Sequence, residues 1–206
     1  MTAQELHTKG REAGQSGNNA EAIAFFEKAH ELDPLWPFPI YDLGFTYLLK
    51  QDYEKAIAYY KQCNQMAPDG YYTAKTALWA LEKEQNGIFP KGLYLSYVQL
   101  EWKEESERMG ILNAMLAQNP NFTPAYKSLQ SLYSDPKERI ELIDKGLALE
   151  TDDETYGMLI INKALLLSFY EKMTEAKQML SDLLASNRVT VMSRRIAESI
   201  IEQWVL

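Results

Sequence analysis

The sequence predicts an all-α protein built from antiparallel helix pairs. Three observations support this fold class: residues 1–70 repeat with a period of 34, each repeat holds two segments whose apolar residues recur at helical spacing, and a proline closes each repeat. Because proline cannot continue a helix, Pro34 and Pro68 mark the ends of two successive pairs. A fixed period of this length is typical of repeat proteins, in which neighbouring units stack and bury a shared core.

Small and aromatic residues occupy the same places in the two repeats. The predicted helices span 6–15 and 20–32 in the first repeat, and 40–49 and 53–66 in the second. Glycine allows paired helices to approach closely, and alanine fills the facing crossing point. A shift of 34 residues superposes Gly10 on Gly44, Ala22 on Ala56, Phe26 on Tyr60, Ala29 on Cys63 and Pro34 on Pro68.

On these residues the chain resembles the tetratricopeptide-repeat family, whose 34-residue pattern has a small residue at the helix crossing, a later Ala, an aromatic residue and a closing Pro. Residues 3–36 and 37–70 match this pattern, although Leu6 and Ile40 stand in place of the family's leading Trp. The resemblance implies a right-handed α-solenoid in which the first helix of each pair lines a concave groove. It also implies that the protein binds other proteins.

Beyond residue 70 the pattern continues in a weaker form, which gives about five recognisable helix pairs in total. We expect the three later pairs within residues 95–118, 126–147 and 162–184. Pro136 is expected at the first position of a helix, where its missing N–H costs nothing.

Residues 71–85 look like the first helix of a repeat, but no regular second helix follows. Two interpretations remain open: residues 92–103 serve as an atypical partner and the repeat phase slips, or the solenoid breaks at 86–90. We favour the break. The predicted domains are therefore 1–88, with two regular repeats and one following helix, and 89–206, with weaker repeats and a terminal helix.

Residues 189–206 form a predicted amphipathic helix, because Ile196, Ile200 and Trp204 recur at intervals of four. A terminal helix that covers the open end of a repeat stack is what solenoids need for solubility.

The net charge of -8 and the pI near 4.9 argue against nucleic acid as a partner. We expect a neutral or basic protein or peptide instead. The basic residues Arg188, Arg194 and Arg195 are interpreted as the solvated face of the last helix.

The sequence shows no basic start followed by an apolar run and no stretch of about 20 apolar residues, so neither a secretion signal nor membrane insertion is expected. A single cysteine, Cys63, fits a reducing cytoplasm. These features predict a cytoplasmic protein.

No arrangement of residues points to catalysis, a metal or a cofactor, so the chain is not expected to be an enzyme. His7 and His30 are expected to be exposed, and Cys63 occupies a small-residue core position. The acidic runs at 101–107 and 152–154 lack the ligand pattern of a calcium loop, and we interpret both as solvated helix ends.

The candidate binding surface follows from the family resemblance, which places positions 2, 5, 9 and 12 of each repeat in the groove. The second repeat has Leu48 at position 12, the next helix has Glu82 there, and His7 occupies an equivalent place in the first repeat. The sequence leaves open whether the aromatic residues at these positions belong to the core. The candidate partner-binding residues are Arg11, Phe38, Tyr41, Phe45, Tyr72, Lys75 and Trp79.

Some members of this family hold the terminal carboxylate of chaperone tails with a clamp of Lys, Asn and Arg. Here Asp42 would repel a carboxylate and only Arg11 would attract it, so this mode is not expected. The predicted function is a non-catalytic, co-chaperone-like adaptor or scaffold. The alternative is a structural subunit that self-associates as a homo-oligomer.

Overall fold

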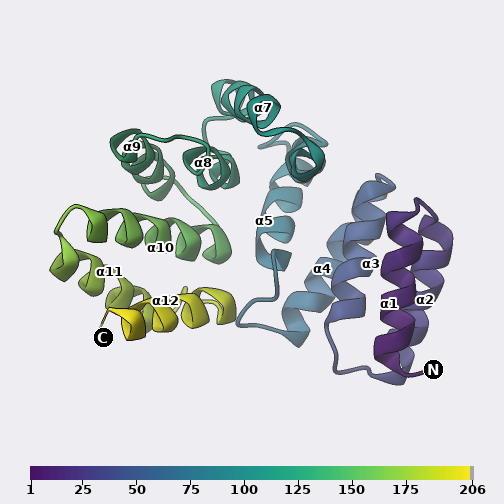
Figure 1. Ribbon diagram of the computed structural model, residues 1–206. Coiled ribbons are helices and arrows are strands. Elements are labelled where there is room, and N and C mark those ends of the chain that lie inside the picture. The colour runs from purple at the N-terminus through teal and green to yellow at the C-terminus, as the bar shows by residue number, and fades with distance from the viewer. Residues whose placement is uncertain (205–206) are drawn as a thin grey trace. The chain divides into compact units, whose positions relative to one another are not determined.

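The computed structural model describes residues 1–204, and all regular secondary structure over this range is helical (Figure 1). The all-α arrangement of helix pairs agrees with the prediction. None of these helices has the length and hydrophobicity needed to span a bilayer. The elements are α1 (Ala3–Gln15), α2 (Asn19–Leu32), α3 (Phe38–Leu49), α4 (Tyr53–Met66), α5 (Ala74–Gln85), α6 (Leu93–Val98), the 3-10 helix η1 (Gln99–Trp102), α7 (Glu105–Gln118), α8 (Thr123–Gln130), α9 (Pro136–Leu147), α10 (Asp153–Phe169), α11 (Met173–Ala185) and α12 (Val191–Gln203).

The chain divides into two compact units, Met1–Leu95 and Ser96–Leu206. The division falls inside α6, seven residues after the boundary that we placed at 88, and the two predicted domains stay a prediction. In the N-terminal unit α1 packs on α2, α2 on α3, α3 on α4 and α4 on α5.

The glycines of the two repeats lie where the paired helices touch. A Cβ atom added at Gly10 would lie 2.5 Å from the ring of Phe26, and one added at Gly44 would lie 3.2 Å from the ring of Tyr60. Both rings are buried. The close approach that the 34-residue alignment predicted is therefore present in both pairs.

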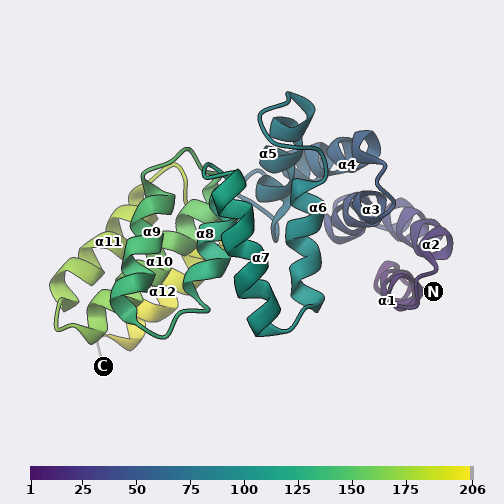
Figure 2. The ribbon, with the colours of Figure 1, turned by 90° about the horizontal axis from the view of Figure 1, so that it is seen from above.

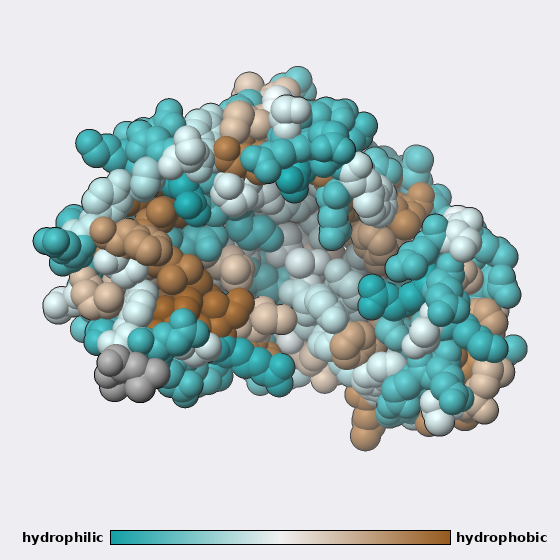
Figure 3. Space-filling model, in the orientation of Figure 1, coloured by the Kyte–Doolittle hydropathy of each residue, from teal (hydrophilic) through white to brown (hydrophobic). Residues whose placement is uncertain are grey.

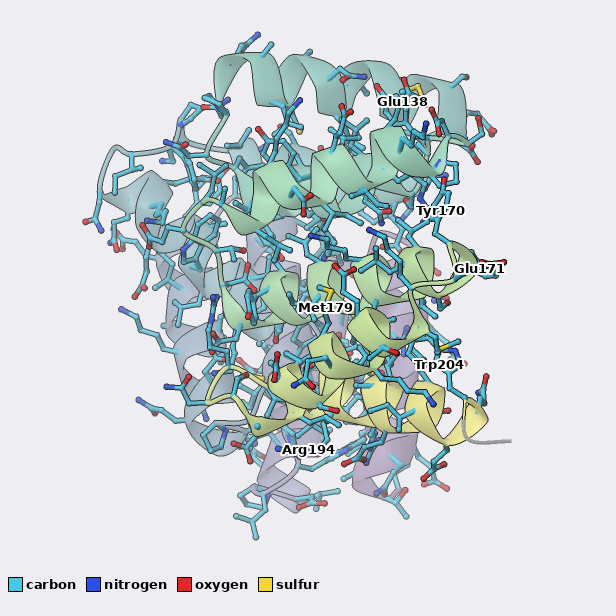
Figure 4. All side chains as sticks on the ribbon, turned by 90° about the vertical axis from the view of Figure 1, so that its left-hand side faces the viewer. Glu138, Tyr170, Glu171, Met179, Arg194 and Trp204 are labelled. Atoms are coloured by element: carbon cyan, nitrogen blue, oxygen red, sulfur yellow. The ribbon has the colours of Figure 1, made fainter. Side chains whose placement is uncertain are left out.

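A residue in the left-handed conformation separates the helices in three pairs. Gly17 has φ +78° and Gln51, 34 residues later, has φ +60°. Glu171 has φ +59° and lies between α10 and α11 (Figure 4). Glycine adopts this conformation without steric cost, whereas Gln51 and Glu171 do not. The repeat geometry thus imposes the turn regardless of the residue type.

The connection after α5 replaces the regular second helix that the sequence lacks. Phe89 is buried against Trp79, with 5.4 Å between the ring centroids. The Glu84 carboxylate accepts hydrogen bonds from the backbone N–H of Gly92 at 2.7 Å and of Tyr94 at 2.6 Å. These contacts fasten the connection and the start of the short helix α6 to α5.

In the C-terminal unit, successive helices from α7 to α12 pack on one another, and α8, α9 and α10 lie side by side (Figure 2). Pro136 lies in the first turn of α9, as predicted, and Asp135 caps that helix. The terminal helix α12 contacts both α10 and α11. Apolar residues gather over α10 to α12 in this unit (Figure 3).

Helix α12 covers the end of the last pair, as predicted. Ala197 is fully buried in a cluster with Ala164, Ala176 and Leu180. The three predicted apolar positions, Ile196, Ile200 and Trp204, are partly buried against the same cluster, and Figure 4 shows Trp204 at the end of α12.

The interpretation of the basic and acidic groups was wrong at three residues. Arg194 and Arg195 are exposed as expected, but Arg188 donates to the Asp153 carboxylate at 3.0 Å and its guanidinium lies 4.0 Å from the centroid of the Tyr156 ring. Asp152 and Glu154 are buried rather than solvated. Asp152 also caps α10 by accepting from the N–H groups of Glu154 and Thr155, which is the favourable helix-end position that the sequence indicated.

Lys127 of α8 faces these buried acids. Burial by itself would lower the pKa of Lys127, but electrostatic attraction to Tyr97, the charges of Asp152 and Glu154, and a hydrogen bond that the ammonium donates to Tyr97 outweigh it, so the pKa is raised above 10.5. The ammonium group therefore offsets part of the cost of burying the two carboxylates.

We expect Lys127→Met to lower the free energy of unfolding by about 2 kcal/mol at neutral pH, because the two acids then lose this nearby positive charge. Because the pKa of Lys127 is higher in the folded than in the unfolded protein, its charge stabilises the fold fully at a pH below the unfolded-state pKa. This stabilisation is lost as the pH rises through the folded-state pKa. The difference between wild type and variant, measured by urea denaturation, should thus shrink above about pH 10.5. Lys137→Met, at an exposed position of α9, serves as the control. Equal losses of unfolding free energy in Lys127→Met and Lys137→Met would contradict a stabilising role for the Lys127 charge.

Candidate functional site

Five rings form an aromatic face on the N-terminal unit, where the turn before α3 and the first turn of α3 meet the turn before α5. Four of them are half-buried, and Tyr72 is 48% exposed. We call this set the aromatic face; its members are Trp36, Phe38, Tyr41, Tyr71 and Tyr72.

Ring contacts hold the face in place, edge-to-face between Phe38 and the two tyrosines Tyr71 and Tyr72, and tilted between Tyr41 and Tyr72. The ring centroid of Phe38 lies 4.8 Å from that of Tyr71 and 5.5 Å from that of Tyr72. Tyr41 lies 5.4 Å from Tyr72, and its hydroxyl is 2.8 Å from the hydroxyl of Thr73. The edge-to-face geometry of the two Phe38 pairs is a favourable one for aromatic rings, so these contacts order the face.

A buried histidine lies beneath the aromatic face. We expected His7 to be exposed, but it is only 6% exposed, and its Nε2 atom is 2.7 Å from the Asp42 carboxylate. The His7 ring also contacts Trp36 edge-on at 4.9 Å and Phe38 at 5.6 Å. The sequence could not reveal this, because His7 and Asp42 meet only when α1 packs beside α3.

The turn before α5 determines the exposure of Tyr72. We aligned Tyr72 with a helical position, but α5 begins at Ala74, and Tyr72 adopts φ +49°. A bulky residue in this conformation is a strained exception. The turn directs the neighbouring Tyr71 inward and leaves the Tyr72 ring in solvent.

The hydroxyl of Tyr71 is buried within the aromatic face. Burial, followed by the charge of Tyr72 and other nearby groups, raises the pKa of Tyr71 well above 10. Its hydroxyl is buried without a hydrogen-bond partner among the described residues. The hydroxyl is therefore neutral at physiological pH.

The other candidate residues lie apart from these ring contacts. Trp79 packs against Phe89, with the Lys83 ammonium 5.2 Å from its ring centroid. Phe45 of α3 and Lys75 of α5 are half-buried, and Arg11 is exposed on α1. The structure thus brings three of the seven candidates together: Phe38, Tyr41 and Tyr72.

Two further groove positions differ from the expectation. Leu48 is fully buried and belongs to the core. Glu82 forms an ion pair with Lys61 of α4 at 3.0 Å.

Cys63 is fully buried, as its small-residue alignment predicted.

Sequence reasoning missed Trp36 and Tyr71 as members of the site. Each follows a closing proline by two or three residues, in the turn that leads to the next repeat. The alignment treated these turns as connections only. The aromatic residues next to Pro34 and Pro68 were the signal that could have identified them.

The chemistry of the aromatic face is that of an apolar contact surface with hydroxyl groups at its edge. No group of three or more His, Cys, Asp or Glu side chains suited to a metal ion occurs among residues 1–204. The rings present apolar area to a ligand, while Tyr72 and the Tyr41–Thr73 pair present hydroxyls.

Comparison with protein families matches residues 6–34 and 40–69 to the tetratricopeptide repeat. No curated protein matches the chain.

Solved structures of tetratricopeptide-repeat proteins align with most of this chain. The protein TTC0263 of Thermus thermophilus is 19% identical, with a TM-score of 0.40, over 97% of this chain and 100% of that one. YrrB, described as a protein with an unusual peptide-binding site, is 14% identical, with a TM-score of 0.42, over 96% and 90%. MamA of Desulfovibrio magneticus RS-1 is 16% identical, with a TM-score of 0.39, over 87% and 92%. At these identities and scores, no ligand or partner transfers to this chain.

Proposed function

We propose that this member of the tetratricopeptide-repeat family is a non-catalytic adaptor that binds a segment of a partner protein on its aromatic face. The fold is one that serves as a scaffold for protein interactions. The observation that supports the proposal is a set of five contacting rings from two successive repeat junctions, with Tyr72 48% exposed at their edge.

Aromatic anchors commonly dominate the free energy of protein binding, because they supply large apolar area and have few rotatable bonds. Here the rings already contact one another, so binding would cost little side-chain entropy. The net charge of -8 favours a neutral or basic segment. We further propose, from the sequence, that the adaptor is cytoplasmic and acts like a co-chaperone.

The test measures how Tyr72→Ala affects peptide binding. Peptides selected from a random displayed library on the wild-type protein should bind the variant about thirtyfold more weakly, because truncation of an aromatic anchor commonly costs about 2 kcal/mol. The melting temperature should change little, since the ring is half in solvent.

Tyr170→Ala is the matched control, because Tyr170 is a tyrosine of similar exposure, 42%, at the end of α10 (Figure 4). This variant should bind the selected peptides like the wild type. Equal binding by the wild type and Tyr72→Ala would place the peptide site elsewhere. Concentration-dependent self-association that Tyr72→Ala abolishes would instead assign the aromatic face to a second copy of this chain.

The pair Phe45→Ala and Trp79→Ala, which the groove alignment suggests, is a poorer test. Trp79 packs on the buried Phe89, so its truncation would loosen the connection after α5. A loss of binding in that variant would not separate contact from folding.

A further inference from the structure

A recess lies in the N-terminal unit and shares no residue with the aromatic face. Its volume is about 260 Å³, below the range of about 300–1,000 Å³ that is usual for small-molecule sites, so it suits a single side chain better than a cofactor. The start of α4, the end of α5 and the connection that follows α5 line the recess with Tyr53, Glu54, Ile57, Leu81, Glu84, Gln85 and Lys91.

The polar wall of the recess is acidic. Glu84 is only 9% exposed, and each of its carboxylate oxygens accepts one backbone N–H, from Gly92 and from Tyr94. Since a carboxylate has about four acceptor sites, two remain for another donor. No described residue forms an ion pair with Glu84. Burial raises its pKa, against the lowering effect of the two amides and of Lys91.

The remaining wall is apolar and aromatic. Ile57 and Leu81 are buried, and the Lys91 ammonium lies 5.0 Å from the centroid of the Tyr53 ring. Burial and the charge of Glu84 raise the pKa of Tyr53, which places the phenol in the field of that carboxylate. The recess therefore combines a desolvated negative charge, an aromatic ring that already attracts a cation, and an aliphatic surface.

We infer that this recess binds an arginine side chain of a partner protein. The aliphatic stem matches Ile57 and Leu81, and the guanidinium can donate to Glu84 and Glu54 while it stacks on a tyrosine ring. Lysine fits less well, because its ammonium neither stacks nor donates two parallel hydrogen bonds.

Lys91 is the internal competitor for this site. Its ammonium occupies the position over Tyr53 that an incoming guanidinium needs, and it repels a second cation. The inference therefore predicts opposite effects for neighbouring substitutions: loss of Glu84 or Glu54 weakens binding, and loss of Lys91 strengthens it. This inference does not depend on the aromatic face.

The test titrates N-acetyl-arginine methylamide into the labelled protein and follows the amide signals of Gly92 and Tyr94 by NMR. These amides donate to Glu84, so they report a ligand on its carboxylate. The arginine probe should shift both signals, the lysine analogue should shift them less, and the citrulline analogue, which has nearly the same shape without the charge, should not shift them.

Variants separate binding from folding. Glu54→Gln leaves the Glu84 hydrogen bonds intact and should weaken arginine binding about threefold to tenfold, whereas Lys91→Ala should strengthen it. Glu84→Gln should abolish arginine binding. If that variant unfolds, Glu54→Gln and Lys91→Ala still test whether arginine binds in the recess. Equal shifts with arginine and citrulline, or unchanged arginine binding in both Glu54→Gln and Lys91→Ala, would overturn the inference.

Discussion

Removal of residues 189–206 is expected to make the protein aggregate and to lower its thermal stability by several degrees or more. Helix α12 covers a cluster that includes the buried Ala164, Ala176 and Leu180, and the deletion would expose their apolar surface to water. Burial of apolar area stabilises by about 25 cal/mol per Å², and the uncovered end of a repeat stack promotes association. Size-exclusion chromatography and thermal melts measure both effects.

A point variant tests the same contact without shortening the chain. Ala197 is fully buried between α12 and its neighbours, so Ala197→Asp would place a carboxylate in an apolar site and should reproduce much of the loss. Arg195→Asp, at an exposed position of α12, is the control and should behave like the wild type. A truncated protein that stays monomeric and melts at the wild-type temperature would show that α12 is not a cap.

Substitution of Gly10 by leucine is expected to destabilise the N-terminal unit by about 3 kcal/mol, the upper part of the range for overpacking. Even a Cβ atom at this position would lie 2.5 Å from the Phe26 ring, so either the ring or the helix must move. Gly44→Leu should cost less, about 1–3 kcal/mol, because the corresponding distance to Tyr60 is 3.2 Å. Chemical denaturation gives both values.

Two further variants identify the cause. Gly110→Leu on α7 is the control: its Cβ would meet no atom within 4 Å, and leucine favours a helix over glycine by roughly 1 kcal/mol, so stability should not fall. In a double-mutant cycle, Phe26→Ala should offset part of the loss caused by Gly10→Leu, because the two side chains compete for one space. Strict additivity of the two losses would show that the repeat alignment misplaces Gly10.

The sequence by itself determined the helix pairs of the first two repeats. Proline at 34 and 68 ends each repeat, and the aligned glycines lie where the paired helices touch, because a side chain there would meet the ring of Phe26 or Tyr60. The same local logic identified Pro136 at the start of α9 and the apolar stripe of α12. These features depend on spacing within one helix or on a repeat of fixed period, and a sequence displays both directly.

Only the tertiary structure decided which polar residues are buried. His7 meets Asp42 across 35 positions, and Lys127 shares its surroundings with Asp152 and Glu154, all through contacts between different helices. From residue type alone, His7, Asp152 and Glu154 were expected to be exposed to solvent.

The tertiary structure also determined which rings make up the aromatic face. The turn before α5 adopts a conformation that Tyr72 itself does not favour, so the exposure of that ring follows from the packing of the helices on either side. The family resemblance placed Phe38, Tyr41 and Tyr72 on one surface, but only the folded turns before α3 and α5 brought Trp36 and Tyr71 to them. Local sequence sets where helices begin and end, whereas the partner of each buried side chain depends on the path of the whole chain.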